Sequence, residues 1–396
     1  MLMVAVMAAS CSKQGTEGNL IPRKDIVLTK AQTEYVEEGN ALAFNYFHSA
    51  YLPTSFVLSP FSLQRALGML CNGAQGKTKE EIEKVIGYGE GRVSEVNTFL
   101  QAYAQQLQAI DPSIRFQWAD ALLLNPNFPL QEEFVNKVSS SYLASVNNLD
   151  FFSDPAGCRK WINDWAYSHT DGMIPSLVES ISQETVFLLL NAVAFKGSWT
   201  TDFRSDETFK APFYCLDGHE VQVDMMHQSG TFRYASNENY RLICLPYGNE
   251  AFQMVVLLPL ENHDLSSVTH EEWNRLLADA KEQKVPVSLP KFKIHNVSNI
   301  NRTLSVMGMP AAFSEEADFS LLSPGPIRLS ETLQGCSLEV SESGTTAAAA
   351  TALAGKVDTA NLEKAPVVFN ANHSFLFAIM EKSTQGILMM GQFCGL

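Results

Sequence analysis

The chain is poor in charged residues and especially short of cations. Charged side chains make up 18% of its 396 residues, and 28 Lys and Arg stand against 43 Asp and Glu, for a formal net charge of -15. Nucleic acids and anionic membrane surfaces attract basic proteins, so this balance argues against both as partners. Because 46% of the residues are hydrophobic, the chain can bury a large core.

Motifs that carry out catalysis are also missing. The sequence has no Gly-x-Ser-x-Gly and no phosphate-binding Gly-x-x-x-x-Gly-Lys, and the glycines of 87–91 lack the Rossmann spacing. Residues 270–274 begin like a zinc-protease motif, but Asn274 stands where its second histidine belongs. We therefore predict that the chain is not an enzyme and needs no cofactor.

No two cysteines follow the Cys-x-x-Cys spacing, which disfavours zinc ligation, and we predict no metal site. Apart from Cys11, the cysteines are widely spaced in a long chain. This spacing favours buried thiols over a disulfide framework. The residues concerned are Cys71, Cys158, Cys215, Cys244, Cys336 and Cys394.

The amino-terminal residues 1–10 are apolar but too few to span a bilayer, which takes about 20 residues. They are typical of the end of a secretory signal peptide. Ala8-Ala9-Ser10-Cys11 resembles a bacterial lipobox, in which the cysteine is lipidated and begins the mature protein. Ala8 replaces the usual Leu and the positively charged front is absent, so we expect the true start upstream.

This pattern predicts a signal peptide at 1–10 and a lipidated Cys11 followed by a polar tether, together residues 11–30. The protein is then exported and held as a lipoprotein in the periplasm or at the cell surface, with the membrane contacted only through the lipid. The alternatives are a simply secreted, extracellular protein and an unprocessed terminus.

The rest of the chain, 31–396, shows no repeat or linker and is predicted to be one domain. Thr78 and Glu81 predict a capping box for a helix closed by Gly87, and Asp154-Pro155 predicts another helix with Trp161 and Trp165 on one face. Strand-like runs occur at 186–195, 252–258, 285–295, 375–380 and 387–393. Helices early and strands late indicate an α+β fold.

An alanine-rich run at 342–351, Glu-Ser-Gly-Thr-Thr-Ala-Ala-Ala-Ala-Thr, has neither helical periodicity nor clear alternation. An alanine-rich helix or a small-residue linker would explain it. Extended as a strand, however, it presents one uncharged and mostly small face from Thr345 to Val357, while Glu342, Lys356 and Asp358 share the other face. Such a segment could enter a sheet without burying a charge.

The same run resembles the reactive-loop hinge of inhibitory serpins, and other segments resemble that family in the same order along 31–396. Asn191-Ala192-Val193-Ala194-Phe195-Lys196-Gly197-Ser198-Trp199 is similar to a family signature almost residue for residue. Further matches lie at 58–62, 73–78, 289–292, 317–320 and 369–377. The resemblance implies the serpin fold: a helix-rich amino-terminal part packed on three mainly antiparallel sheets, with an exposed reactive-centre loop at about 342–365.

By this resemblance the protein is an inhibitor that a serine or cysteine protease cuts as a substrate and that traps the covalent acyl complex by inserting its loop into a sheet. The alternative within the family is a non-inhibitory binding or storage protein. A monomer is expected. The implied hinge residues are Glu342, Gly344, Thr345, Ala347, Ala349 and Thr351.

The resemblance also assigns the bond that is cut and the residues around the opening sheet. The scissile bond falls at Asp358-Thr359, which suits caspase-like or acidic-specific proteases. Lys356-Val357 would suit trypsin-like enzymes, and the neighbouring Ala, Leu and Val would suit elastase-like or subtilisin-like ones. A polar shutter cluster is implied at Ser59, Ser62, Asn191 and Gln334, where the family often has His in place of Gln334, and Trp199 is implied at the breach where the sheet first opens.

Overall fold

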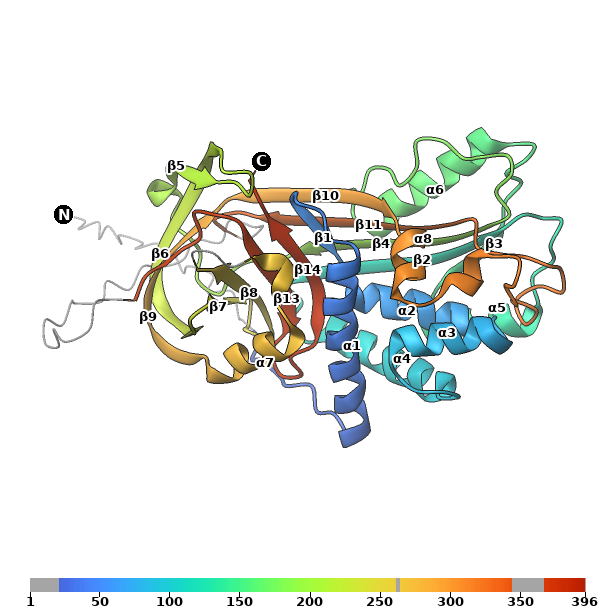
Figure 1. Ribbon diagram of the computed structural model, residues 1–396, viewed down its shortest axis with the longest axis horizontal. Helices are drawn as coiled ribbons and strands as arrows, with labels where there is room; N and C mark the ends of the chain where they lie inside the picture. The colour runs from blue at the N-terminus through green and yellow to red at the C-terminus, as the bar shows by residue number, and fades with distance from the viewer. Residues whose placement is uncertain (1–20, 261–263, 344–366, 396) are drawn as a thin grey trace, which may run out of the picture.

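The computed structural model describes residues 21–260, 264–343 and 367–395, and Figure 1 shows their arrangement. Most of the helices come early in the chain and most of the strands come late. The helices are α1 (Lys30–Ser49), α2 (Pro60–Cys71), α3 (Gly76–Ile86), α4 (Val93–Ala109), α5 (Glu132–Tyr142), α6 (Pro155–His169), α7 (His270–Asp279) and α8 (Asn301–Met307). The predicted α+β class is confirmed.

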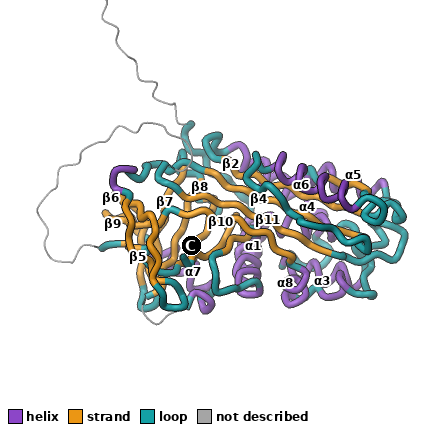
Figure 2. The backbone as a smooth tube through the Cα atoms, turned by 90° about the horizontal axis from the view of Figure 1, so that it is seen from above, coloured by secondary structure: helices purple, strands orange, loops and turns teal. Residues whose placement is uncertain are grey.

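A five-stranded sheet runs along the length of the molecule (Figure 2). Its strands, in spatial order, are β10 (Phe292–Asn299), β11 (Glu331–Val340), β4 (Phe187–Lys196), β2 (Arg115–Leu124) and β3 (Ser145–Asn148). The neighbours β10 and β11 pair antiparallel, as do β4 and β2, whereas β11 and β4 pair in parallel. The predicted strand at 186–195 is thus a central strand, and its nearly continuous apolar run fits burial on both faces.

The other strands form a nine-stranded sheet. Their spatial order is β1 (Phe56–Leu58), β14 (Ile387–Phe393), β13 (Phe375–Glu381), β8 (Phe252–Pro259), β7 (Tyr240–Tyr247), β6 (Glu220–Ser236), β9 (Lys281–Pro290) and β12 (Phe369–Asn370), with β5 (Phe209–Tyr214) beside β6. The 17-residue β6 pairs with β5, β7 and β9. It therefore joins two of the three sheets expected from the family into one hydrogen-bonded surface.

The five-stranded sheet separates two apolar layers. On one face, Ile162 and Trp165 of α6 pack over Leu188, Leu190 and other small and apolar residues of β2 and β4. On the opposite face, Leu189 and Val193 of β4 belong to the larger core that contains α1 to α5. Figure 1 shows α6 and the α2 to α4 helices on opposite sides of this sheet. Alternate residues of β4 thus point into different layers.

Two expectations about local structure are wrong. The helix predicted from Thr78 begins earlier, after Gln75, and Thr78 Oγ1 instead accepts from Asp318 N at 2.9 Å. The run 285–295 is not one strand, because β9 ends at Pro290 and β10 begins at Phe292 in the other sheet. By contrast, Asp154 caps α6 as predicted, with Gly157 N donating to its Oδ1 at 2.8 Å.

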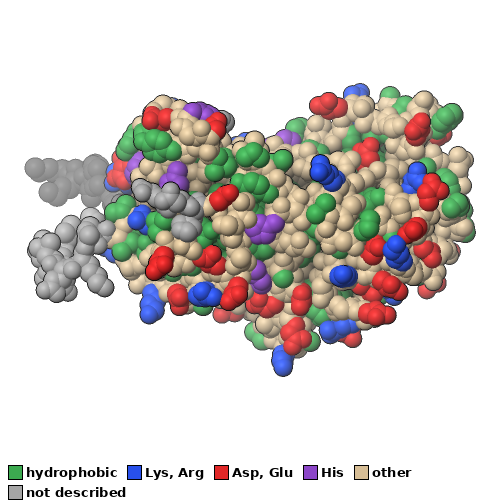
Figure 3. All heavy atoms as spheres, viewed as in Figure 1, with side chains coloured by type: hydrophobic (Ala, Val, Ile, Leu, Met, Phe, Trp, Pro, Cys, Tyr) green, Lys and Arg blue, Asp and Glu red, His purple; other side chains and the backbone are tan. Residues whose placement is uncertain are grey.

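Acidic side chains are spread over the face of the molecule drawn in Figure 3 and are interspersed with fewer Lys and Arg. The described cysteines are free thiols, and all but Cys215 are buried. Within 21–260, 264–343 and 367–395, no helix is both long and apolar enough to cross a bilayer.

Candidate functional site

The parallel pairing of β4 and β11 is the central feature of the candidate site, and we call it the seam. It runs from Glu331 opposite Leu188 to Leu338 opposite Phe195. The alanine-rich run follows β11 within a few residues. A strand that folded back from the end of β11 would run antiparallel to β11. Because β4 is parallel to β11, this strand would be antiparallel to β4 as well. The seam therefore has the strand directions that would accept one further antiparallel strand.

Asn191 and Gln334 face each other across the middle of the seam. They are register partners, and both are 2% exposed. Gln334 Nε2 donates to Asn191 Oδ1 at 2.8 Å. A strand entering between β4 and β11 must break this side-chain hydrogen bond together with the backbone ladder beside it.

Ser59 and Ser62 complete the shutter cluster from the start of α2, where Ser59 caps the helix by accepting from Ser62 N at 3.2 Å. Gln334 bonds the backbone of Ser59 twice, since its Oε1 accepts from Ser59 N at 3.0 Å and its Nε2 donates to Ser59 O at 3.2 Å. Asn191 Nδ2 donates to Ser62 Oγ. The predicted residues thus lie together and tie α2 to both strands of the seam.

Two charged residues that the sequence analysis missed extend the shutter cluster. Asp120 on β2 is the register partner of Asn191, and its Oδ1 accepts from Asn191 Nδ2 at 2.8 Å. Its Oδ2 lies 3.3 Å from Arg65 Nε, with side chains 1% and 3% exposed. Burial raises the pKa of Asp120, while the charge of Arg65 and the hydrogen bond from Asn191 oppose the rise.

Arg65 is held by more than its partner carboxylate. Its Nη2 donates to Tyr142 O at 2.6 Å, and its guanidinium carbon lies 5.6 Å from the ring centroids of both Trp118 and Tyr142. Asp120 could have indicated this ion pair from the sequence alone. It is a carboxylate inside the apolar run Trp118 to Leu124, and a buried carboxylate needs a buried partner.

At one end of the seam, Trp199 and Glu342 hold the start of the alanine-rich run. Trp199 Nε1 donates to Ser341 O at 2.8 Å, and its ring stacks on Tyr247 with centroids 4.1 Å apart. Lys291 Nζ donates to Glu342 Oε2 at 2.9 Å. Burial acts to raise the pKa of Glu342, but the hydrogen bonds from Lys291 and the backbone and the charge of Lys291 together lower it.

The segment after α6 covers the seam on the face opposite the shutter cluster. A Cβ added to Gly335 of β11 would lie 2.4 Å from Leu177 Cδ2 and 3.5 Å from Ile174 Cδ1. Ile174 and Leu177 belong to the same apolar layer as Leu188 and Leu333 of the two seam strands. An inserting strand would therefore have to displace this cover as well as part the strands.

The remaining predicted residues lie outside the described part of the chain. These are the hinge residues Gly344, Thr345, Ala347, Ala349 and Thr351, the candidate cleavage residues Lys356, Val357, Asp358 and Thr359, and Cys11. Their assignments stay predictions.

Comparison with known proteins identifies the family. A family model described as serpin (serine protease inhibitor) matches residues 37–396, so this chain belongs to the serpin family. An uncharacterized serpin-like protein of Thermococcus kodakarensis is 32% identical over 376 residues, covering 93% of this chain and 87% of that protein.

Solved serpin structures superpose on this protein and confirm the predicted serpin fold. The native state of the thermophilic serpin tengpin superposes with a TM-score of 0.85 at 27% identity, covering 95% of this chain and 97% of that chain. Human thyroxine-binding globulin in complex with thyroxine gives a TM-score of 0.82 at 25% identity, covering 91% and 98%. The family described as protease inhibitors therefore also contains a protein that binds thyroxine.

Proposed function

We propose that this protein inhibits serine or cysteine proteases as a single-use trap, acting as a monomer. The protease nucleophile attacks the carbonyl carbon of the scissile residue, and the amino group of the next residue leaves, so an acyl-enzyme forms. The loop amino-terminal to the cut then inserts into the seam and carries the protease with it. Insertion must be faster than hydrolysis of the acyl bond.

The observation that carries this proposal is the seam itself. Its parallel strands are paired directly, and the alanine-rich run starts at the anchored residue Glu342. Residues 344–358, extended at about 3.3 Å each, reach about 50 Å, which exceeds the length of the 10-residue β11. Small residues on one face of that run would pass between the strands with little steric hindrance.

We place the cut at Asp358-Thr359, with Lys356-Val357 as the runner-up. Cleavage at Asp358 would select proteases that accept an acidic residue, whereas cleavage at Lys356 would select trypsin-like proteases. Sequencing the carboxy-terminal peptide released on reaction with a protease panel distinguishes them, since its first residue is Thr359 in one case and Val357 in the other.

Thr345→Arg tests the mechanism. Thr345 is the first residue on the uncharged face of the proposed strand, so Arg there must lose its hydration inside the sheet. A rise of about 1.4 kcal/mol in the insertion barrier slows insertion about tenfold. We expect the variant to be cut at the wild-type rate but to release active protease, with few complexes that survive SDS.

Thr346→Arg is the matched control, because Thr346 would lie on the opposite face of the proposed strand, the face that it shares with Glu342, Lys356 and Asp358. We expect this variant still to give complexes. If Thr345→Arg forms complexes at wild-type stoichiometry, the run does not insert as assigned. If the wild-type protein forms complexes with no serine or cysteine protease, the non-inhibitory alternative, a binding or storage protein, is correct.

We further propose that the protein is exported and anchored through a lipid on Cys11. A diacylglyceryl group, joined to the cysteine sulfur by a thioether bond, would hold the protein to a membrane without a spanning helix. In a bacterial host, Cys11→Ala should move the protein from the membrane to the soluble fraction. If the wild type and Cys11→Ala partition equally between the two fractions, Cys11 is not the anchor and the protein is better described as simply secreted.

A further inference from the structure

The turn between β5 and β6 brings three different metal-ligating side chains together. These are Cys215, Asp217 and His219, and one ligand atom from each lies within 4.8 Å of the other two. None of them belongs to the seam or the shutter cluster. We propose that this turn binds a divalent transition metal ion of the zinc class.

The backbone holds the three residues on one tight turn. Cys215 N donates to His219 O at 2.9 Å, and Gly218 N donates to Cys215 O at 3.0 Å. Gly218 has φ +85, a conformation that glycine adopts without strain. Because the backbones of Cys215 and His219 are hydrogen-bonded to each other, their side chains are attached close together. Asp217 is the middle residue of this turn.

The chemistry of the three ligands favours zinc over calcium or magnesium. Thiolate and imidazole suit zinc-class ions, whereas calcium and magnesium take oxygen ligands. In a tetrahedral zinc site with the usual bond lengths, ligand atoms lie about 3.5 Å apart. In this turn no two of the ligand atoms are more than 4.8 Å apart, so the side chains need to close by little more than about 1 Å to reach that value.

The charges also match. A thiolate, a carboxylate and a neutral imidazole carry two negative charges, which a divalent ion neutralises. His219 Nδ1 already contacts Asp217 Oδ1, and the two side chains are 61% and 67% exposed, so an ion can reach them from solvent. A water molecule would complete the fourth position.

Cys215 differs from the other described cysteines in a way that suits ligation. It is the one among them that is not buried, while Gly395 packs against its sulfur so closely that an added Cβ would lie 2.6 Å away. The thiol is therefore supported by the carboxy-terminal backbone and still accessible. The Cys-x-Asp-x-His spacing differs from both Cys-x-x-Cys and the zinc-protease motif, so neither pattern indicates this turn.

The test is titration of the reduced, chelator-treated full chain with Co²⁺, followed by competition with Zn²⁺. We expect one equivalent to bind with a Kd on the order of a micromolar, with a thiolate-to-cobalt charge-transfer absorption that one equivalent of Zn²⁺ removes. Cys215→Ser should abolish that absorption, and Asp217→Asn and His219→Gln should each weaken binding at least about tenfold.

Cys11→Ser is the matched control, because it removes a cysteine outside the turn and should leave the titration unchanged. The proposal is overturned if no charge-transfer absorption develops, if it persists in Cys215→Ser, or if Cys11→Ser abolishes it. Thermal melting of each metal-free variant establishes that it is folded. The readout is spectroscopic, so its result does not depend on whether the protein inhibits a protease.

Discussion

Gln334 joins both strands of the seam to the helices beside them through four hydrogen bonds. Its amide accepts from Ser59 N and from Tyr46 OH, the latter at 3.1 Å, and it donates to Ser59 O and Asn191 Oδ1. These bonds use both its donors and both its acceptor lone pairs. A neutral imidazole offers one donor and one acceptor, so the histidine that the family often places here could not make the same set. Gln334 also gives the seam no group that gains charge near neutral pH.

Asp120→Asn should destabilise the protein strongly. The amide keeps the shape of the carboxyl group but leaves Arg65 as a buried charge without a counter-ion. We expect a loss of about 3–5 kcal/mol in the free energy of unfolding, measured by urea denaturation. In the active protein, the loss of a fixed partner for Asn191 should also change the rate of loop insertion.

Asp164→Asn serves as the control for this prediction. Asp164 pairs with Lys160 on the surface of α6, with side chains 65% and 73% exposed. An exposed pair one helical turn apart contributes about 0.3–0.5 kcal/mol, so this variant should melt close to the wild type. Equal effects of the two substitutions would mean that the Asp120–Arg65 pair does not stabilise the native state.

Residues of the shutter cluster could be assigned from the sequence only through family resemblance. Asn191 did stand out by itself, because an amide in an apolar run needs buried partners. Its partners could not be named, since Ser62 and Asp120 lie 129 and 71 positions away along the chain. Such distant contacts depend on the topology of the sheet, which no local pattern encodes.

At the scale of elements, the sequence was informative where the signal is local. Asp154 before Pro155 caps α6, and Gly87 ends α3 with φ +87. The predicted capping box of Thr78 and Glu81 is wrong because both side chains bond to a distant segment. Thr78 Oγ1 accepts from Asp318 N, and Glu81 Oε2 accepts from Ala311 N at 2.8 Å. Both groups stabilise the approach of a distant loop to α3 instead of capping their own helix.

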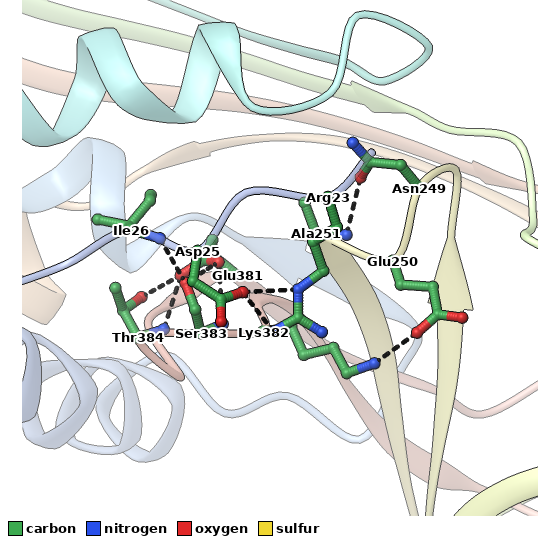
Figure 4. Close-up of polar contacts among 10 residues, drawn as sticks. All are labelled: Arg23, Asp25, Ile26, Asn249, Glu250, Ala251, Glu381, Lys382, Ser383 and Thr384. Carbon is green, nitrogen blue, oxygen red and sulfur yellow. Dashed lines mark hydrogen bonds and ion pairs between the residues drawn. The ribbon is translucent and has the colours of Figure 1, made fainter. Parts of the chain in front are cut away.

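The β13–β14 turn joins several elements through one carboxylate, Glu381 (Figure 4), which is completely buried. Its Oε1 accepts from Ser383 N and Oγ at 2.9 and 2.6 Å, and its Oε2 accepts from Thr384 N and Oγ1 at 2.7 and 2.6 Å. Ser383 Oγ in turn accepts from Ile26 N at 2.9 Å. The amino-terminal segment before α1 is thereby attached to this turn.

Glu381→Gln should weaken this turn, because the new amide nitrogen cannot accept from Thr384 or Ser383. One buried backbone N–H loses its partner, and we expect a loss of about 1–3 kcal/mol in the free energy of unfolding. Hydrogen exchange at Ile26, whose amide is held by Ser383, should accelerate in the variant. Unchanged exchange at Ile26 would show that the carboxylate does not order the amino-terminal segment.

Glu250→Gln provides the comparison in the same region. Glu250 Oε2 lies 2.8 Å from Lys382 Nζ, but its side chain is 47% exposed. The exposed pair contributes no more than about 1 kcal/mol, and no buried group is left without a partner. This variant should leave exchange at Ile26 as it is in the wild type.

At the scale of the whole molecule, the proposed loop insertion would require the packing on both faces of the seam to open at one place. The seam is held on one face by the shutter cluster and α2, and covered on the other by α6 with Ile174 and Leu177. The sequence could indicate strands and helices, but it could not indicate that β4 and β11 pair in parallel. Register partners of these two strands, such as Asn191 and Gln334, are 143 positions apart along the chain.

The nicked protein tests this arrangement as a whole. Cutting between Gly355 and Lys364 frees the amino-terminal part of the loop to enter the seam, where it would pair with β4 and β11 on both sides. About ten added backbone hydrogen bonds at about 1 kcal/mol each should raise the Tm by at least about 10 °C. The measurement is calorimetry on intact and nicked protein, with nicked Thr345→Arg as the control that should gain much less. An unchanged or lower Tm of the nicked wild type would mean that the seam stays closed, and that the parallel pair of β4 and β11 is a fixed part of the sheet.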